Sequence, residues 1–125
     1  MSIQTIMTAD QSGFELVEFA KKTAESLTLS DTQIRTIFSE VRSIEALWSN
    51  DPVKARRRLN MLKPKLAYQA ARDNKVKELR DILTEAIGCV ESTNDEKRGE
   101  VFKRFVDLFE AILAYYKAKP KKERY

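Results

Sequence analysis

Apolar residues recur along this chain at intervals of three and four, which is the spacing of one face of an α-helix. The first such run follows Ser12 and Gly13 and predicts a helix of about four turns. A second run extends from Ile34 to Trp48, and it begins just after Ser30 and Gln33, which form a capping-box pattern. No stretch alternates between apolar and polar residues as a half-buried strand does. The first part of the chain is therefore predicted to be helical.

The third predicted helix contains a proline. Asn50 or Asp51 can cap it, and Pro52 suits its first position, where the missing N–H is harmless. A proline in a helix interior removes one hydrogen bond and disfavours helical geometry in the residue before it. We therefore predict that this helix is kinked or broken near Pro64, with Lys63 as the break point. One apolar face nevertheless continues across the proline, formed by Leu59, Leu62, Leu66 and Ala70.

Two more helices complete the prediction. The fourth runs from about Val76 to Val90, and a polar loop over 91–96 follows it, with Thr93 as the expected cap of the last helix. That last helix ends near Ala118. The fold class is accordingly all-α: a compact bundle of about five helices in a single domain, 1–125, with residues 1–11 and 118–125 flexible.

The composition excludes several kinds of catalytic and metal-binding site. The 125 residues include no His and one Cys, so imidazole acid–base catalysis, His metal ligands, intramolecular disulfides and Cys-cluster zinc sites are excluded. Acidic pairs such as Asp107 with Glu110 lie among basic residues on faces expected to be exposed. We therefore expect no catalytic residues, no metal and no cofactor. No apolar run approaches the roughly 18 residues of a membrane span, and the first ten residues lack the basic segment of a secretory signal. The expected location is cytoplasmic, away from membranes.

The net charge of +4 is unevenly distributed. Residues 51–75 contain eight Lys or Arg and two Asp or Glu, whereas residues 1–50 and 76–100 each contain three more acids than bases. A concentrated positive field attracts polyanions even when the total charge is small. Two interpretations stay open at this point: a nucleic-acid-binding surface, and a solvated helix face that binds nothing.

The basic residues of the third helix are spaced to share one side of it. Steps of three, four and seven keep residues together on a helix, and such steps connect six residues that we call the basic face: Lys54, Arg58, Lys65, Tyr68, Arg72 and Lys75. Arg56 and Arg57 flank it. Cations at these positions suit RNA phosphates, and no base-reading residues accompany them, so little sequence preference is expected. Tyr68 either stacks on a base or closes the core, and Arg72 either contacts phosphate or interacts with the helix C-terminus.

Three stretches resemble the small subunit of type III-A CRISPR effector complexes, the Csm small-subunit family. They are LTLSDTQIRTIF at residues 27–38, LKPKLAYQAARDNKVKEL at 62–79 and RFVDLFEAILAYYK at 104–117. Lys63, Lys65, Tyr68 and Arg72 match the middle motif, and Arg35 matches the first. Ala71 departs from the family pattern, which often has Gly at that place.

The resemblance implies a non-catalytic helical subunit in antiviral defence. Several copies would line the interior of the complex, beside the backbone and large subunits, and would contact the duplex of CRISPR RNA and target RNA. RNA and DNA cleavage in such complexes belong to other subunits. The alternative from the charge pattern is a helical adaptor that binds an acidic protein partner. The candidate RNA-binding residues are Lys54, Arg57, Arg58, Lys63, Lys65, Tyr68, Arg72 and Lys75.

Overall fold

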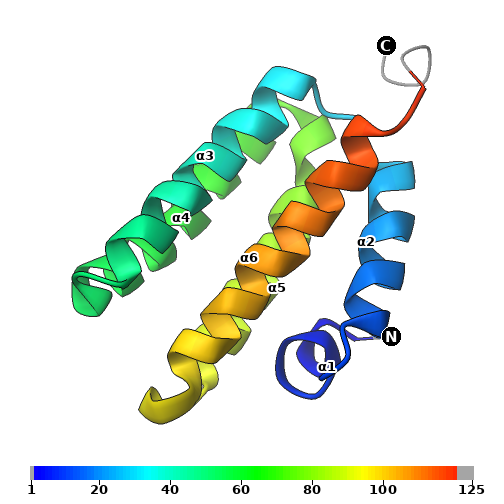
Figure 1. Cartoon of the computed structure of the whole chain (residues 1–125). Helices are drawn as coiled ribbons and strands as arrows, with labels where there is room; N and C mark the ends of the chain where they lie inside the picture. Colours follow the sequence, from blue (N-terminus) through cyan, green and yellow to red (C-terminus); the bar gives the residue numbers. More distant parts are fainter. Residues whose placement is uncertain (1, 121–125) are drawn as a thin grey trace.

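A computed structural model describes residues 2–120, and helices account for nearly all of them (Figure 1). The elements are α1 (Ile3–Thr8), α2 (Phe14–Ser26), α3 (Asp31–Trp48), α4 (Pro52–Arg72), a 3₁₀ turn over Asn74–Val76, α5 (Lys77–Ser92) and α6 (Asp95–Lys117). This part of the chain contains no strand, so the all-α prediction is confirmed. The number of α-helices is six, one more than predicted.

The helices form a bundle whose centre is the pair α5 and α6 (Figure 1). On one side, α3 packs along α4, and these two contact α6 and α5 respectively; on the other side lie α2 and the short α1. Phe105 and Phe109 of α6 are fully buried between the two sides. The predicted apolar row of α4 is buried as well, so the opposite side of α4 faces outward.

The additional helix is α1, which lies in the segment 1–11 that is expected to be flexible. Ile3, Ile6 and Met7 are buried, and the Ser2 hydroxyl accepts a hydrogen bond from the Thr5 N–H at 3.1 Å. A helix of six residues is unstable alone. Its packing against α5 and α6 therefore supplies the stability that local sequence lacks.

Several predicted helix starts are confirmed. Ser30 Oγ accepts from the Gln33 N–H at 3.1 Å, and the Ser30 N–H donates to Gln33 Oε1 at 2.8 Å, which completes the capping box. Asp51 caps α4, with Pro52 at its first position. The N-cap of α2 is Gly13, whose φ of 83° is left-handed, a conformation that favours glycine.

The start of α6 is one residue later than predicted. Its cap is Asn94, whose side chain accepts from the Lys97 N–H at 3.1 Å. Thr93 instead donates its hydroxyl to the carbonyl of Cys89 at 2.9 Å, and so belongs to the end of α5. The predicted polar loop shrinks to residues 93–94.

Of the two alternatives predicted at Pro64, a break is wrong, because α4 is one continuous helix of 21 residues; a kink stays a prediction. Pro64 removes a single N–H, the one that would bond to the carbonyl of Asn60. The residues on either side, Leu62 and Leu66, are both buried on the same face. Burying this face along the whole helix offsets the loss of one hydrogen bond.

The end of the chain is described as far as Pro120. Lys119 Nζ donates to the carbonyls of Ala24 at 2.8 Å and Leu27 at 3.0 Å, and thus ties residues after α6 to the end of α2. The flexibility expected for 118–125 stays a prediction, and residues 121–125 lie outside the described part. Every helix within residues 2–120 is too short or too polar to span a bilayer.

Candidate nucleic-acid interface

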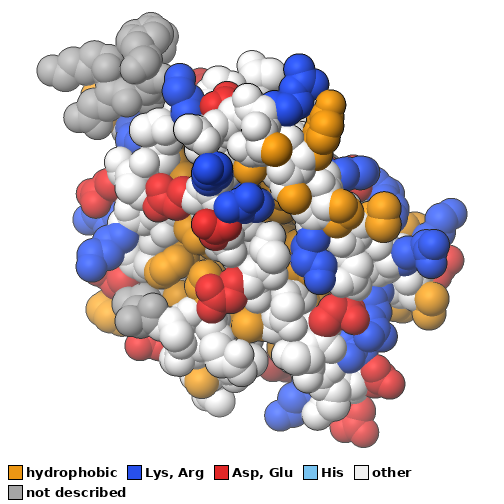
Figure 2. Space-filling model, turned by 180° about the vertical axis from the view of Figure 1, so that it is seen from behind, with side chains coloured by type: hydrophobic (Ala, Val, Ile, Leu, Met, Phe, Trp, Pro, Cys, Tyr) orange, Lys and Arg blue, Asp and Glu red, His pale blue; other side chains and the backbone are white. Residues whose placement is uncertain are grey.

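The outward side of α4 carries the candidate site. Figure 2 views the molecule from behind, and Lys and Arg side chains gather over the half of that view where α4 lies, with hydrophobic side chains between them. Lys54, Lys65, Tyr68 and Arg72 are exposed, and Arg58 is half-buried. The structure therefore brings five of the six members of the basic face onto one side of α4, as their spacing predicts.

Arg58 is held by the neighbouring helix α3. Its Nη2 lies 3.0 Å from both carboxylate oxygens of Glu40 and 3.2 Å from Ser43 Oγ. The same carboxylate lies 3.9 Å from Lys65 Nζ, a long ion pair in which the Lys65 side chain is 60% exposed. Glu40 therefore neutralises mainly Arg58, and Lys65 keeps most of its charge available to a ligand.

Tyr68 does not close the core, since it is 63% exposed, and that interpretation is wrong. Arg72 Nη1 donates to the Tyr68 hydroxyl at 3.2 Å, and the guanidinium carbon lies 5.7 Å from the ring centroid, within range of a cation–π contact. The hydrogen bond of Arg72 thus goes to Tyr68 rather than to a carbonyl at the end of α4. The two side chains form one exposed unit of a cation and an aromatic ring.

Lys63 and Lys75 lie elsewhere. Lys63 is two residues from Lys65, so it lies about 200° around the helix from it, and it is half-buried. It follows Arg56 by two turns and so shares the flank of α4 that faces α5. Lys75 lies beyond the end of α4, in the 3₁₀ turn, where its N–H donates to Asp73 Oδ1 at 3.0 Å. The prediction that Lys75 continues the helical face is therefore wrong, because Asp73 ends the helix before it.

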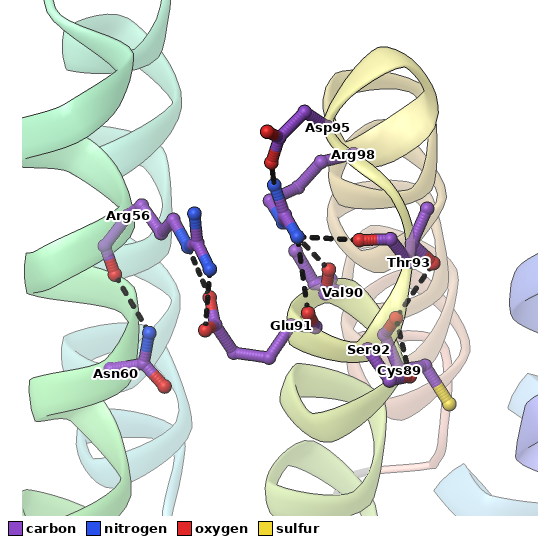
Figure 3. Close-up of polar contacts among 9 residues, drawn as sticks. All are labelled: Arg56, Asn60, Cys89, Val90, Glu91, Ser92, Thr93, Asp95 and Arg98. Atoms are coloured by element: carbon purple, nitrogen blue, oxygen red, sulfur yellow. Dashed lines mark hydrogen bonds and ion pairs between the residues drawn. The ribbon is translucent and has the colours of Figure 1, made fainter.

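Arg56 and Arg57 flank the basic face in different ways. Arg57 is exposed. Arg56 is bound to Glu91 of α5, with Nε 2.6 Å from Oε2 and Nη2 2.9 Å from Oε1 (Figure 3). The hydrogen bonds from Arg56 are the main reason that the pKa of Glu91 falls from 4.5 to about 2. Arg56 is therefore committed to holding α4 against α5.

A third helix strengthens this junction. Arg98 of α6 donates to the carbonyls of Val90, Glu91 and Thr93 at the end of α5, and it pairs with Asp95 (Figure 3). These are carbonyls that a helix end leaves without partners. The junction fixes one end of α4 relative to α5 and α6, and thereby the direction in which the basic face points.

An open groove lies beside the basic face, between α3 and α4. We call it the α3–α4 groove; its volume is about 830 Å³, and its lining includes Thr32, Thr36, Met61, Lys65, Tyr68 and Arg72. A smaller hollow of about 310 Å³ shares Thr36, Lys65 and Gln69 with it and continues towards Glu40. The sequence predicted three of these residues as RNA-binding: Lys65, Tyr68 and Arg72. It did not predict that Met61 and residues of α3 line the same surface. The position of Met61, seven residues before Tyr68 and four before Lys65, was the available signal.

Two residues that line the groove, Gln33 of α3 and Asp73 after α4, contact each other. Gln33 Nε2 donates to Asp73 Oδ2 at 2.9 Å. This bond and the N–H of Lys75 lower the pKa of Asp73, so its carboxylate stays charged and engaged. Asp73 is the one acidic residue that lines the groove within the described chain. The lining therefore carries a positive balance.

Other reactive groups are placed away from this surface. Cys89 is buried, and burial raises the pKa of its thiol, which keeps it protonated. Burial also raises the pKa of Asp107, with a contribution from Glu110 nearby. Within residues 2–120, no three His, Cys, Asp or Glu side chains come together in a way that could hold a metal ion.

A known protein family matches most of this chain. The model of the Csm2 Type III-A family matches residues 10–122. Neither the curated proteins nor the solved structures yielded a match. The family match covers almost the whole described chain, including α4 and the α3–α4 groove.

Proposed function

Because the chain belongs to the Csm2 Type III-A family, and so is a small subunit of a type III-A CRISPR complex, we propose that it binds RNA inside that complex through the basic face of α4. The ligand is the duplex of CRISPR RNA and target RNA. The subunit contributes phosphate contacts and no catalytic group, and other subunits carry out cleavage. Lys54, Lys65 and Arg72 supply the principal contacts.

The observation that carries this proposal is the exposure of these three cations. In the described part of the chain, Lys54 has no carboxylate partner, Lys65 has one at 3.9 Å, and Arg72 forms a hydrogen bond with Tyr68 and no ion pair. By contrast, Arg56 and Arg58 each have a carboxylate within 3.0 Å. A cation that is already paired releases fewer counterions from RNA than a free one, so the free cations dominate binding.

The remaining candidates have smaller expected roles. Arg57 is exposed and can add a contact at the edge of the duplex. Lys63 lies on the flank of α4 that faces α5, and Lys75 lies past the end of α4. Each reaches RNA only if the duplex extends to that position. Little sequence preference is expected, since phosphates carry no sequence information.

The test is binding of the purified protein to a 30-base-pair RNA duplex across a salt series. The variant combines Lys54→Gln, Lys65→Gln and Arg72→Gln. Each phosphate contact contributes about 0.7 to 0.9 to the slope of log affinity against log salt concentration. The slope should therefore fall by about two units in this variant.

The matched control combines Lys21→Gln, Lys22→Gln and Lys97→Gln, which removes the same charge from exposed positions on α2 and α6. Its slope should stay close to that of the unchanged protein. Equal losses in both triple variants would mean a diffuse attraction and would contradict a defined interface. Absence of RNA binding at low salt, together with tight binding to an acidic protein, would favour the adaptor alternative.

A further inference from the structure

The α3–α4 groove has features that phosphate binding alone does not use. Tyr68 and Met61 are 63% and 52% exposed, although both are large apolar side chains. They lie seven residues apart on α4 and line the same groove together with Pro64. Phosphates have no affinity for such a surface, whereas the flat face of a base stacks on it.

One face of the Tyr68 ring is available for stacking. The guanidinium of Arg72 lies over the Tyr68 ring at 5.7 Å, and the hydrogen bond to the hydroxyl fixes the two side chains together. A guanidinium covers one face of a ring, and the high exposure of Tyr68 means that the remaining surface is open. The ring is thus held in place and accessible, which lowers the entropy cost of stacking a base on it.

The α3 side of the groove supplies groups for a base edge. Thr32 and Thr36 of α3 and Gln69 of α4 line the groove. Across residues 2–120, no hydrogen bond engages the hydroxyls of these threonines or the side-chain amide of Gln69. Hydroxyl and amide groups both donate and accept, so they can pair with any base, and unpaired bases are recognised on these edges.

The volume and the charge of the α3–α4 groove also suit a nucleotide. The volume of about 830 Å³ lies within the range of about 300–1,000 Å³ that small-molecule sites occupy. Lys65 and Arg72 stand at the groove and can hold the phosphate of the nucleotide whose base enters it. Bases inside a duplex are stacked on one another and cannot enter, so the groove requires a base that has left the stack.

From these features, and resting on the RNA-binding function proposed above, we infer that the α3–α4 groove binds one unpaired nucleotide of the RNA, with its base stacked on Tyr68 and its phosphate held by Lys65 and Arg72. The duplex then lies along the basic face, and an extruded base anchors it at the groove. Stacking accepts every base, so this site prefers unpaired nucleotides without selecting a sequence.

The experiment compares two RNA duplexes that differ by one additional, unpaired 2-aminopurine nucleotide in the centre of one strand. Affinity is measured by fluorescence anisotropy with the full chain, using an end label. The bulged duplex should bind about tenfold tighter than the perfect duplex, as expected for one base–aromatic stack. The fluorescence of 2-aminopurine should change on binding, because the base exchanges its neighbours in the duplex for the tyrosine ring.

Two substitutions at Tyr68 form a matched pair. Tyr68→Phe keeps the ring and should retain most of the preference for the bulged duplex. Tyr68→Leu keeps an apolar side chain without a ring and should bind the two duplexes equally, so that the ratio of their affinities falls from about ten to about one. Because Tyr68 is exposed, both variants should fold, which circular dichroism checks.

The outcomes separate the two proposals. Equal binding of the two duplexes by the unchanged protein would overturn the groove site and leave the phosphate interface standing. A preference that survives in Tyr68→Leu would also overturn it, since the extruded base would then lie elsewhere. Failure to bind either duplex would overturn the RNA-binding function, and the groove site with it.

Discussion

The ion pair between Arg56 and Glu91 is expected to stabilise the fold by holding α4 against α5. The perturbation is Glu91→Gln, which keeps the shape of the side chain and removes its charge. The pKa of Glu91 falls from 4.5 to about 2 in the folded protein, mainly because Arg56 donates hydrogen bonds to it. A difference of this size corresponds to about 3 kcal/mol if it were fully expressed.

Solvent reduces this value. The side chains of Arg56 and Glu91 are 39% and 30% exposed, so water and salt screen the pair. Two parallel hydrogen bonds join the two charged groups, so this pair should contribute more to stability than an ordinary surface pair does. We therefore expect Glu91→Gln to lower the free energy of unfolding at pH 7 by about 1 kcal/mol.

The pH dependence gives the sharper test. A carboxyl whose pKa is lowered by folding stabilises the protein above its unfolded pKa, and this stabilisation is lost as the pH falls through the folded value. The difference between the unchanged protein and the variant should therefore be constant above about pH 5 and shrink to about half by pH 3.5, because the window lies between 4.5 and about 2.

The assay is urea denaturation at pH 7 and pH 3.5, followed by circular dichroism at 222 nm. The control is Glu85→Gln, an exposed carboxylate of α5 with no ion pair in the described part of the chain, which should change stability by less than about 0.5 kcal/mol. The reasoning would be refuted if the two variants lost equal stability at pH 7. A difference at pH 7 that persists unchanged at pH 3.5 would refute it as well.

Two further substitutions test the packing of the bundle. Pro64→Ala restores an N–H that can bond to the carbonyl of Asn60 in the continuous helix α4. The restored hydrogen bond should outweigh the entropy that the unfolded chain regains without proline, so urea denaturation should show a net stabilisation of about 1 to 2 kcal/mol. A destabilised variant would show that α4 depends on the proline. Tyr116→Phe removes the hydroxyl that donates to the carbonyl of Leu29 in the core and leaves that acceptor without this donor, which should cost about 1 to 3 kcal/mol in the same assay. An unchanged denaturation midpoint would contradict that expectation.

The helices themselves were largely predictable from local sequence. The capping box at Ser30 and the cap at Asp51 followed by Pro52 lie where the pattern places them. These features depend on residues within four positions of one another, so the spacing along the chain contains the needed information. The same holds for the outward direction of Lys54, Lys65 and Arg72, since a buried face on one side of α4 fixes what the other side presents.

The predictions of local structure failed where packing against segments distant in the sequence determines the conformation. The short helix α1 exists because Ile3, Ile6 and Met7 pack on α5 and α6, and no local signal in six residues could outweigh the entropy of ordering them. The continuity of α4 through Pro64 likewise depends on what its buried face packs against. In both places tertiary packing outweighed a local preference.

The sequence by itself determined a helical protein with a basic face on its third long helix and a resemblance that the family match confirms. Only the tertiary structure decided which of those cations are free. Arg58 pairs with Glu40, which is 18 residues away in the sequence, and Arg56 pairs with Glu91, which is 35 residues away. The order of residues along the chain does not specify either contact. The α3–α4 groove has the same origin, because it exists only where two separately encoded helices lie side by side. Short-range hydrogen bonds and periodic burial are written along the chain, whereas charge pairing and concave surfaces arise when the helices dock.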